Sequence, residues 1–471
     1  MASKIKFSSI VLIIAPLIAT ISLSIWPTPK VLDAAWSSLN QPVPAKENAL
    51  RLKALKNIVE WQPENGAAWE QIGISAFYLD QCDLTELAFS KAEMNRVIGK
   101  ESLFLLADCQ LAESQSEAYL HTLAELSTHA DLSSGDYQTI VSKLREAGDF
   151  GILSFTVNAW ENKFPADNDA ILWKSWILAA TQPIEAYAYL KPVISKPEWS
   201  GNLRELYLTL QTLDYSQDLA YQLVVVGQLF SSIGIWDLAE VAFRNAIDIS
   251  PDYAEAWALL GNALNRQNKP GYDALQTAER LSPNSAIVMV MQARYYHSIK
   301  DDQNAKKYLD RLLLSEPEEP AWQIEYGALL LDEGNLEKAA EYYIEAVNLA
   351  PQNPYYWKAL AWFCLDNAIY IDSIGIYAAE TALKLSPDDP AAYDVVGWSM
   401  YQLEDLESAA DYLTKALKID STYALAYLHL GQVSFAQGKK ELAKENFQNA
   451  YQYASDGETR KLAERFLNTN F

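Results

Sequence analysis

The residue types that most often carry catalysis or bind metal ions are few and scattered in this chain. It has four histidines and three cysteines: His121, His129, His297, His429, Cys82, Cys109 and Cys364. No H-E-x-x-H or C-x-x-C spacing occurs among them, so the ligand spacing of a zinc site is missing. There is no G-x-S-x-G nucleophile motif, and residues 261–271 lack the closing Gly-Lys-Ser/Thr of a phosphate-binding loop. The sequence therefore predicts a protein that is not an enzyme and holds neither a metal ion nor a cofactor.

Two tryptophans suggest a binding role instead. The stretch YYWKALAWFCLD, residues 355–366, places Trp357 and Trp362 five residues apart. On an α-helix five residues turn the chain by about 500°, so the two indoles point about 140° apart. A narrow apolar stripe cannot bury both. We therefore expect one of them to pack in the core and the other to face a different surface.

The charge of the chain limits its partners. Its 37 basic and 61 acidic residues give a net charge of −24, and half of the residues are hydrophobic. Such a composition can bury a large core and is not typical of disorder. The negative charge repels nucleic acids and anionic lipid headgroups, so we expect no nucleic-acid partner. The charge also has a simpler explanation, which is solubility.

Residues 7–26 carry no charged side chain and follow Lys4 and Lys6. Twenty apolar residues form a helix of about 30 Å, enough to cross a bilayer. Residues 1–27 are therefore predicted to be a transmembrane anchor with a cytoplasmic N-terminus, which places the rest outside the cytoplasm. The alternative is a cleaved signal sequence and a secreted or periplasmic protein. The Pro-rich residues 28–47 are predicted to be a spacer.

The elements that position the tryptophans repeat along the chain. Prolines recur at spacings of 32, 34, 34 and 36 residues, at Pro251, Pro283, Pro317, Pro351 and Pro387. Between the third and fourth of these, Gly334 is placed to end one helix and Asn335 to begin another. Each unit is therefore expected to be a helix, a turn, a second helix and a second turn.

This pattern resembles the tetratricopeptide repeat (TPR) family, which has an aromatic, a Leu-Gly pair, further small and aromatic residues and a closing proline. The unit from residue 220 matches at Leu223, Val226, Gly227, Phe230, Ala239, Phe243, Ala246 and Pro251. Small residues in such units let helices approach closely, and the aromatics fill the remaining space. The resemblance implies an all-α fold, a right-handed TPR solenoid of helix-turn-helix units, here preceded by one transmembrane helix.

The match divides the rest of the chain. Degenerate units are expected over residues 48–199, an irregular helix or hinge over 200–219, a regular TPR array over 220–455 and a capping helix over 456–471. Solenoids need such a polar cap at an open end. In the same mapping Cys82 begins a second helix and Cys109 lies late in the next first helix, so the pair is either bridged or two buried thiols. Cys364 falls on a helix-packing position and should be inert.

The resemblance also implies that the first helix of each unit lines a concave groove with its second, fifth, ninth and twelfth residues. The candidates for partner binding that we select from these positions are Trp362, Trp398, Tyr401, Tyr355, Ile324, Val290, Arg294 and His297. Contiguous apolar side chains on a solvent-facing helix surface indicate binding. The alternative is that these side chains fill a closed superhelix. Trp357 occupies the aromatic position of the repeat and should pack between helices.

These observations predict a membrane-anchored scaffold that assembles an envelope or membrane protein complex. Its ligand would be an apolar or amphipathic protein segment bound in the groove. Two other classes remain open. One is a chaperone-like holder of apolar or unfolded segments, and the other is an accessory subunit of a separately encoded membrane enzyme.

Overall fold

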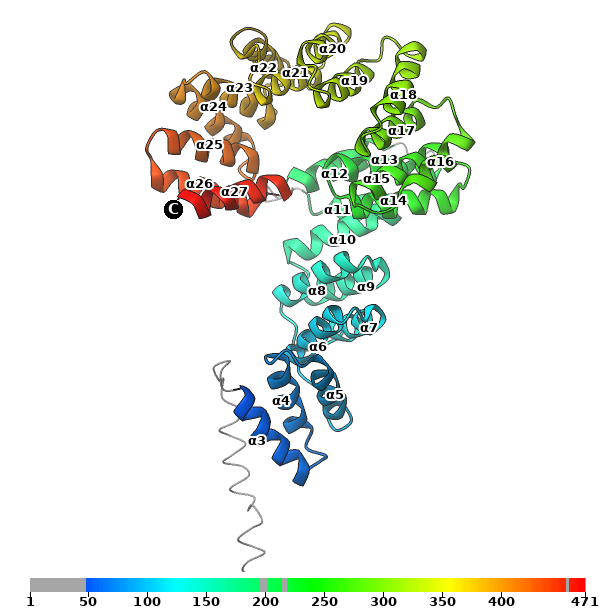
Figure 1. The fold of residues 1–471 in the computed structure, drawn as a ribbon, viewed down its shortest axis with the longest axis vertical. Helices are drawn as coiled ribbons and strands as arrows, with labels where there is room; N and C mark the ends of the chain where they lie inside the picture. Colours follow the sequence, from blue (N-terminus) through cyan, green and yellow to red (C-terminus); the bar gives the residue numbers. More distant parts are fainter. Residues whose placement is uncertain (1–47, 195–200, 214–217, 455–456, 471) are drawn as a thin grey trace, which may run out of the picture. The chain divides into compact units, whose positions relative to one another are not determined.

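The computed structural model describes residues 48–194, 201–213, 218–454 and 457–470. Throughout these residues the chain forms helices joined by short turns (Figure 1). It divides into two compact units, Met1–Ile171 and Leu172–Phe471. We describe each unit by itself.

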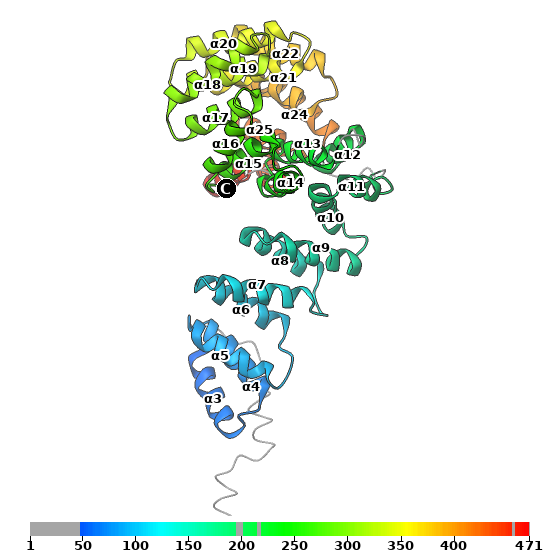
Figure 2. The same cartoon turned by 90° about the vertical axis from the view of Figure 1, so that its right-hand side faces the viewer.

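The described part of the first unit contains seven complete helices and the start of an eighth. They are α3 (Asn48–Trp61), α4 (Gly66–Phe77), α5 (Cys82–Glu93), α6 (Lys100–Ala112), α7 (Ser116–Ser127), α8 (Ser134–Ala147) and α9 (Phe150–Lys163), followed by α10 (Asn168–Thr181), which contains the division. From α4 on they pack as consecutive pairs, α4 with α5, α6 with α7 and α8 with α9, and both views show these partners side by side (Figures 1 and 2).

The second unit continues the same arrangement over a longer run. Its helices are α11 (Pro183–Leu190), α12 (Gly201–Thr212), α13 (Leu219–Ser232), α14 (Trp236–Ile249), α15 (Ala254–Arg266), α16 (Tyr272–Leu281), α17 (Ala286–Ser298), α18 (Asp302–Ser315), α19 (Pro320–Asp332), α20 (Leu336–Leu349), α21 (Pro354–Asp366), α22 (Ile376–Leu385), α23 (Pro390–Gln402), α24 (Leu406–Ile419), α25 (Ala424–Ala436), α26 (Lys440–Tyr453) and α27 (Gly457–Asn470). From α13 to α26 each odd-numbered helix pairs with the next one.

Within the second unit, first helices also contact one another across the repeat. α13 touches α15, α15 touches α17, α21 touches α23, and α23 touches α25. Residues on these helices therefore meet partners about one repeat away in the sequence. This arrangement positions the candidate site.

Small residues set the distance between the two helices of a pair. A methyl group built on Gly227 of α13 would lie 2.4 Å from the Phe243 ring of α14, and one on Gly431 of α25 would lie 2.6 Å from Phe447 of α26. Contacts that short do not occur in folded proteins, so the ring occupies the space that only glycine leaves open. The small-residue positions that the sequence indicated therefore act as close-packing points.

The turns agree with the sequence pattern. Gly334 has φ +77°, a left-handed conformation that glycine adopts without strain. The Asn335 side chain accepts a hydrogen bond from the Lys338 backbone N–H and so caps the start of α20. Where the spacing lengthens to 36 residues, a short π-helix at Ile371–Gly375 takes up extra chain before α22.

The predicted membrane localisation is corrected by the structure. None of the helices in the described residues is long and apolar enough to cross a bilayer. The segment that predicted an anchor, residues 7–26, belongs to residues 1–47 and lies outside the described residues. We therefore carry neither the anchor nor a membrane contact into the functional interpretation.

Candidate functional site

The two tryptophans of α21 have different surroundings. The indole N–H of Trp357 donates to the Pro351 carbonyl at 2.8 Å, and its ring meets Tyr377 of α22 edge to face with centroids 5.7 Å apart. Trp357 thus joins the start of its helix to its pair partner. Trp362 is half-buried against the core of α19 to α23, and its ring lies 5.8 Å from that of His429. Trp357 has a structural role, which leaves Trp362 as the candidate for binding.

Trp362 belongs to a cluster of rings from three successive first helices, which we call the aromatic cluster: Trp362 of α21, Trp398 and Tyr401 of α23, and His429 of α25. The Trp398 ring stacks on Tyr401 at 4.6 Å and on His429 at 4.2 Å between centroids. The structure therefore brings together three of the residues selected from the sequence, although they come from helices 36 residues apart. Stacked aromatic side chains are stiff and offer a preorganised contact area.

A buried polar pair holds this cluster in place. Nδ1 of His429 lies 2.7 Å from Oδ1 of Asp394, and Asp394 is completely buried. Tyr423 lies nearby, and burial together with the Asp394 carboxylate raises the pKa of its hydroxyl well above the usual value. Asp394 therefore fixes the imidazole on which Trp398 stacks. Asp394 is the fifth residue of α23, a position that the TPR resemblance assigns to the groove surface, but it has no exposed area and lies behind that surface.

His429 was not selected from the sequence. It occupies the sixth position of its first helix, which the groove mapping did not include. The signal that points to it is its separation of 35 residues from Asp394. That is one repeat plus one residue, a spacing that lets side chains on touching first helices face each other. Pairing polar residues at this spacing would have found the contact.

Arg294 and His297 of α17 lie apart from the aromatic cluster, in an ion-pair network. Arg294 Nε donates to both carboxylate oxygens of Glu325, at 3.1 and 3.0 Å. His297 places Nδ1 3.1 Å from Asp302 and Nε2 3.1 Å from Asp332. Both residues line a polar cavity of about 680 Å³. The sequence placed all eight candidates in one groove, whereas the structure separates these two from the tryptophans.

The three remaining candidates differ in exposure. Tyr355 is 59% exposed at the start of α21 and is available to a partner. Ile324 of α19 is half-buried and packs on the neighbouring core. Val290 is only 3% exposed, so its placement in the groove was wrong. It lies within six consecutive buried residues, 288–293, because α15, α16 and α18 enclose the middle of α17.

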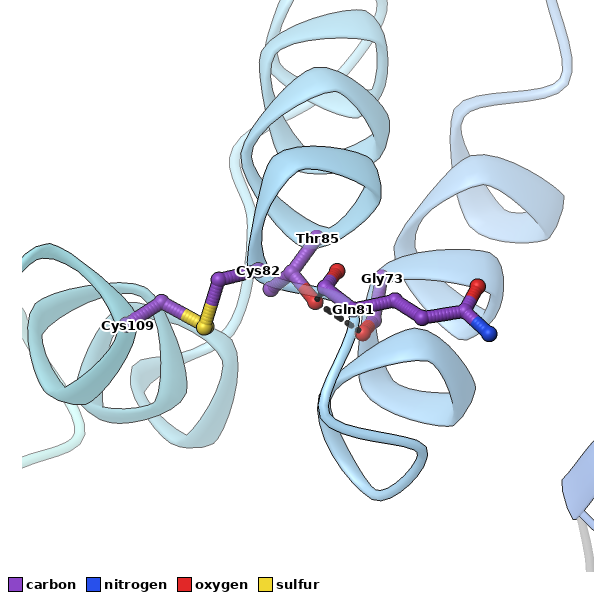
Figure 3. Close-up of a disulfide and its surroundings, with 5 residues drawn as sticks. All are labelled: Gly73, Gln81, Cys82, Thr85 and Cys109. Atoms are coloured by element: carbon purple, nitrogen blue, oxygen red, sulfur yellow. Dashed lines mark hydrogen bonds between the residues drawn. A yellow bond between two sulfur atoms is a disulfide. The ribbon is translucent and has the colours of Figure 1, made fainter. Parts of the chain in front are cut away.

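The cysteines are settled by the structure. Cys82 at the start of α5 and Cys109 of α6 form a disulfide with Cα atoms 5.3 Å apart (Figure 3). Beside the bridge, the Thr85 hydroxyl donates to the Gly73 carbonyl at 3.3 Å, which ties α5 to α4. Cys364 is fully buried, and burial raises the pKa of its thiol to about 11. Its burial agrees with the helix-packing position that the sequence assigned to it.

The described residues contain no group of three or more His, Cys, Asp or Glu side chains arranged to hold a metal ion. The recurring chemistry of the candidate site is instead contact between side chains one repeat apart. Examples are Arg294 with Glu325, Lys358 with Asp389, and Asp394 with His429.

Comparison with known sequences agrees with the repeat pattern. Residues 300–363 and residues 424–456 match two family models, each described as a tetratricopeptide repeat. A curated relative, the Protein CTR9 homolog of Arabidopsis thaliana, is 24% identical over 219 residues, which is 44% of this chain. The chain spans 20% of the length of that relative.

Two solved structures have similar helical arrays. The crystal structure of the yeast Tom70 aligns with 14% identity and a TM-score of 0.46, covering 90% of this chain and 92% of that one. Cut9, in the crystal structure of the APC/C hetero-tetramer Cut9-Hcn1, aligns with 13% identity and a TM-score of 0.37, covering 90% and 94%. Residues 300–363 and 424–456 are therefore similar to tetratricopeptide repeats, and they lie within an all-α array of paired helices.

Proposed function

We propose that this protein is a non-catalytic scaffold that assembles a protein complex by binding a segment of a partner at the aromatic cluster. The observation that carries the proposal is the stacking of Trp398 between Tyr401 and His429, next to Trp362, on touching first helices. Tetratricopeptide repeats generally bind proteins, and interface hot spots are rich in Trp and Tyr. The exposed Tyr355 extends the surface along α21.

The chemistry of this surface selects a class of partner segment. The cluster offers partly exposed aromatic side chains, which can bury apolar side chains of a partner. The chain as a whole is acidic, with a net charge of −24, and long-range attraction favours partners of opposite charge. The partner segment is therefore amphipathic, with apolar side chains on the rings and basic residues beside them.

The test compares two variants of matched chemistry. Tyr401→Ala removes a ring of the cluster, and Tyr377→Ala removes a ring that is 60% exposed on the second helix α22. Each tagged variant, and Trp398→Ala, is used to isolate partners from the native source. We expect Tyr401→Ala and Trp398→Ala to lose a partner that Tyr377→Ala and the parent chain retain. Circular dichroism verifies that all variants are folded.

The pattern of captured proteins separates the function classes. A scaffold retains one or a few partners in fixed stoichiometry, whereas a chaperone-like holder captures many unrelated chains weakly. An accessory subunit retains an enzyme. Retention of every partner by Tyr401→Ala and Trp398→Ala would contradict the aromatic cluster as the binding surface.

A further inference from the structure

A second concave feature lies on α15 and α17, apart from the aromatic cluster. It is the cavity of about 680 Å³, formed by the C-terminal ends of these first helices, the turns that follow them and the start of α14. Its lining includes the side chains of Asn262, Arg266, Arg294, His297, Lys300 and Asp332. All belong to the second compact unit.

The charge of this cavity is opposite to that of the chain. The protein has 61 acidic and 37 basic residues, yet the cationic side chains of two arginines and a lysine line the cavity beside a single lining carboxylate, that of Asp332. In an acidic protein a local excess of cationic side chains focuses positive potential, which attracts anionic groups. The lining therefore points to a negatively charged ligand.

Some of these cations already have carboxylate partners. Arg294 binds Glu325 through Nε and Nη2, which leaves its Nη1 available as a donor. Lys300 lies 3.3 Å from Asp332 and is 72% exposed. Arg266 differs, because its guanidinium lies 5.1 Å above the Trp236 ring and forms no ion pair with any described residue. A stacked guanidinium keeps its planar edge of N–H donors free for a carboxylate.

The walls of the cavity favour charged side chains over an apolar small molecule. Pockets for small molecules are lined mostly by apolar groups, whereas Trp236 and Tyr295 are the large aromatic side chains of this lining. Amide groups of Asn262, Asn265 and Asn268 add further polar lining. A long polyanion such as nucleic acid is disfavoured, because it would extend beyond the cavity over the rest of a chain whose net charge is −24.

We propose that this cavity binds side-chain carboxylates from an internal acidic segment of a protein partner, with Arg266 and Arg294 as the main ligands. The inference rests on the proposed function only in taking the ligand to be a protein. It concerns different residues and a segment of opposite charge. The chain would thus present two subsites, an aromatic one for apolar side chains and a cationic one for acidic side chains.

The experiment measures the binding of fluorescent peptides to the full chain by anisotropy. One peptide carries an internal run of glutamates and an amidated C-terminus, and its matched control carries glutamines. A third has the glutamine sequence with a free C-terminal carboxylate. Inorganic phosphate is added as a competitor. We expect the glutamate peptide to bind at least about tenfold more tightly than both glutamine peptides, because hydrogen bonds to charged groups are strong. Its affinity should fall as the salt concentration rises.

Matched arginine variants identify the site. Arg266→Gln and Lys300→Gln should each weaken the binding of the glutamate peptide. For Arg266→Gln we expect a loss of affinity of about tenfold. Arg280→Gln, an exposed arginine on the second helix α16, should leave it unchanged. Thermal unfolding verifies the fold of each variant. Trp398→Ala should still bind the glutamate peptide. This variant therefore distinguishes a failure of the cavity proposal from a failure of the aromatic cluster as a binding surface.

Three results with the peptides would overturn the proposal. The first is equal binding of the glutamate and glutamine peptides. The second is tight binding of only the peptide with a free C-terminus. The third is glutamate-peptide binding that Arg266→Gln and Lys300→Gln leave intact in folded protein. Displacement of the bound glutamate peptide by phosphate supports an oxyanion site, whereas phosphate binding without any peptide binding contradicts a protein ligand.

Discussion

The indole of Trp398 stacks on the imidazole of His429, with ring centroids 4.2 Å apart. Behind this stack, His429 contacts the fully buried carboxyl group of Asp394 at 2.7 Å. One imidazole therefore links a side chain at the candidate binding surface to a polar group in the core. Because α23 and α25 meet through these residues, the shape of the aromatic cluster depends on a contact that a partner does not touch.

Removal of His429 should destabilise the C-terminal repeats. In His429→Ala the Asp394 carboxyl group stays buried and loses its imidazole partner, which we expect to lower the free energy of unfolding by about 3 kcal/mol. Chemical unfolding followed by tryptophan fluorescence measures this change. His121→Ala, which removes an exposed histidine of α7, should change stability by less than about 0.5 kcal/mol. Equal stability of His429→Ala and the parent would mean that the pair contributes nothing.

Replacement of either of two glycines by alanine should lower the stability of the fold, for a different reason in each case. Gly227→Ala places a methyl group 2.4 Å from the Phe243 ring, and overpacking of this kind costs about 1–3 kcal/mol. Gly234 has no atom near its missing Cβ but has φ +77°, so Gly234→Ala costs about 1 kcal/mol through backbone strain.

A second substitution distinguishes the two causes. Phe243→Leu lessens the crowding beside Gly227. At Gly397, where Leu413 stands in the same place, a built methyl group would lie 2.8 Å from the leucine, compared with 2.4 Å from the Phe243 ring at Gly227. In the Phe243→Leu background we expect the cost of Gly227→Ala, measured by urea unfolding, to shrink, while the cost of Gly234→Ala stays the same. Additive costs for Gly227→Ala and Phe243→Leu would show that the ring is not the obstacle.

The disulfide should stabilise the first unit. The bridge closes a loop between residues 27 apart in sequence, for which chain entropy predicts about 3–4 kcal/mol. We expect a reductant to lower the Tm of the parent and to leave that of Cys82→Ser unchanged. Cys109→Ser should behave like Cys82→Ser, and the double variant like either one. A parent Tm that does not respond to full reduction, verified by thiol titration, would contradict this expectation.

Asp136 should make the first unit sensitive to acid. Its carboxylate is partly buried, which raises its pKa, but hydrogen bonds from Lys100 and Ser133 outweigh burial and lower the pKa to about 2. Because the folded-state pKa lies below the ordinary value of 3.8, the carboxylate stabilises the fold above about pH 4. This contribution is lost as the pH falls towards about 2.

The comparison variant for this effect is Asp136→Asn. The stability difference between the parent and Asp136→Asn, measured by chemical unfolding, should be largest near neutral pH and should vanish near about pH 2. Lys100→Met should reduce the difference, because Lys100 donates to Asp136 at 2.7 Å. A difference that is constant from neutral pH to about pH 2 would exclude titration of Asp136 as its cause.

The repeat was predictable because its signal is local and recurs. Proline spacing, small residues such as Gly227 and a capping residue such as Asn335 each act within one unit, and each recurs about every 34 residues. The helix and turn positions in 318–351 followed directly from them. The division of the chain at 199 and 220 remains a prediction, while the structure has its two compact units meet at residue 171.

The candidate site was less predictable because it depends on contacts between neighbouring repeats. A consensus position tells which way a side chain leaves its own helix but not how deeply the next helices cover it. Val290 and Asp394 were mapped to the surface, and both are buried by neighbouring helices. The disulfide between Cys82 and Cys109 could not be predicted for the same reason, because it depends on the distance between two helices of neighbouring repeats.

The contact between Trp357 and Pro351 recurs in the chain. The indole N–H of Trp69 donates to the Pro63 carbonyl, and that of Trp257 to the Pro251 carbonyl, each at 2.8 Å as in Trp357. Each of these bonds spans six residues and stays inside one inter-repeat turn with the helix that follows it. Both partners of this hydrogen bond at the junction between consecutive repeats therefore belong to one short stretch of sequence. A repeat that is duplicated, deleted or moved between such prolines therefore keeps the tryptophan–proline hydrogen bond of its own turn. The number of repeats can change without a change in the contacts of the turns between them.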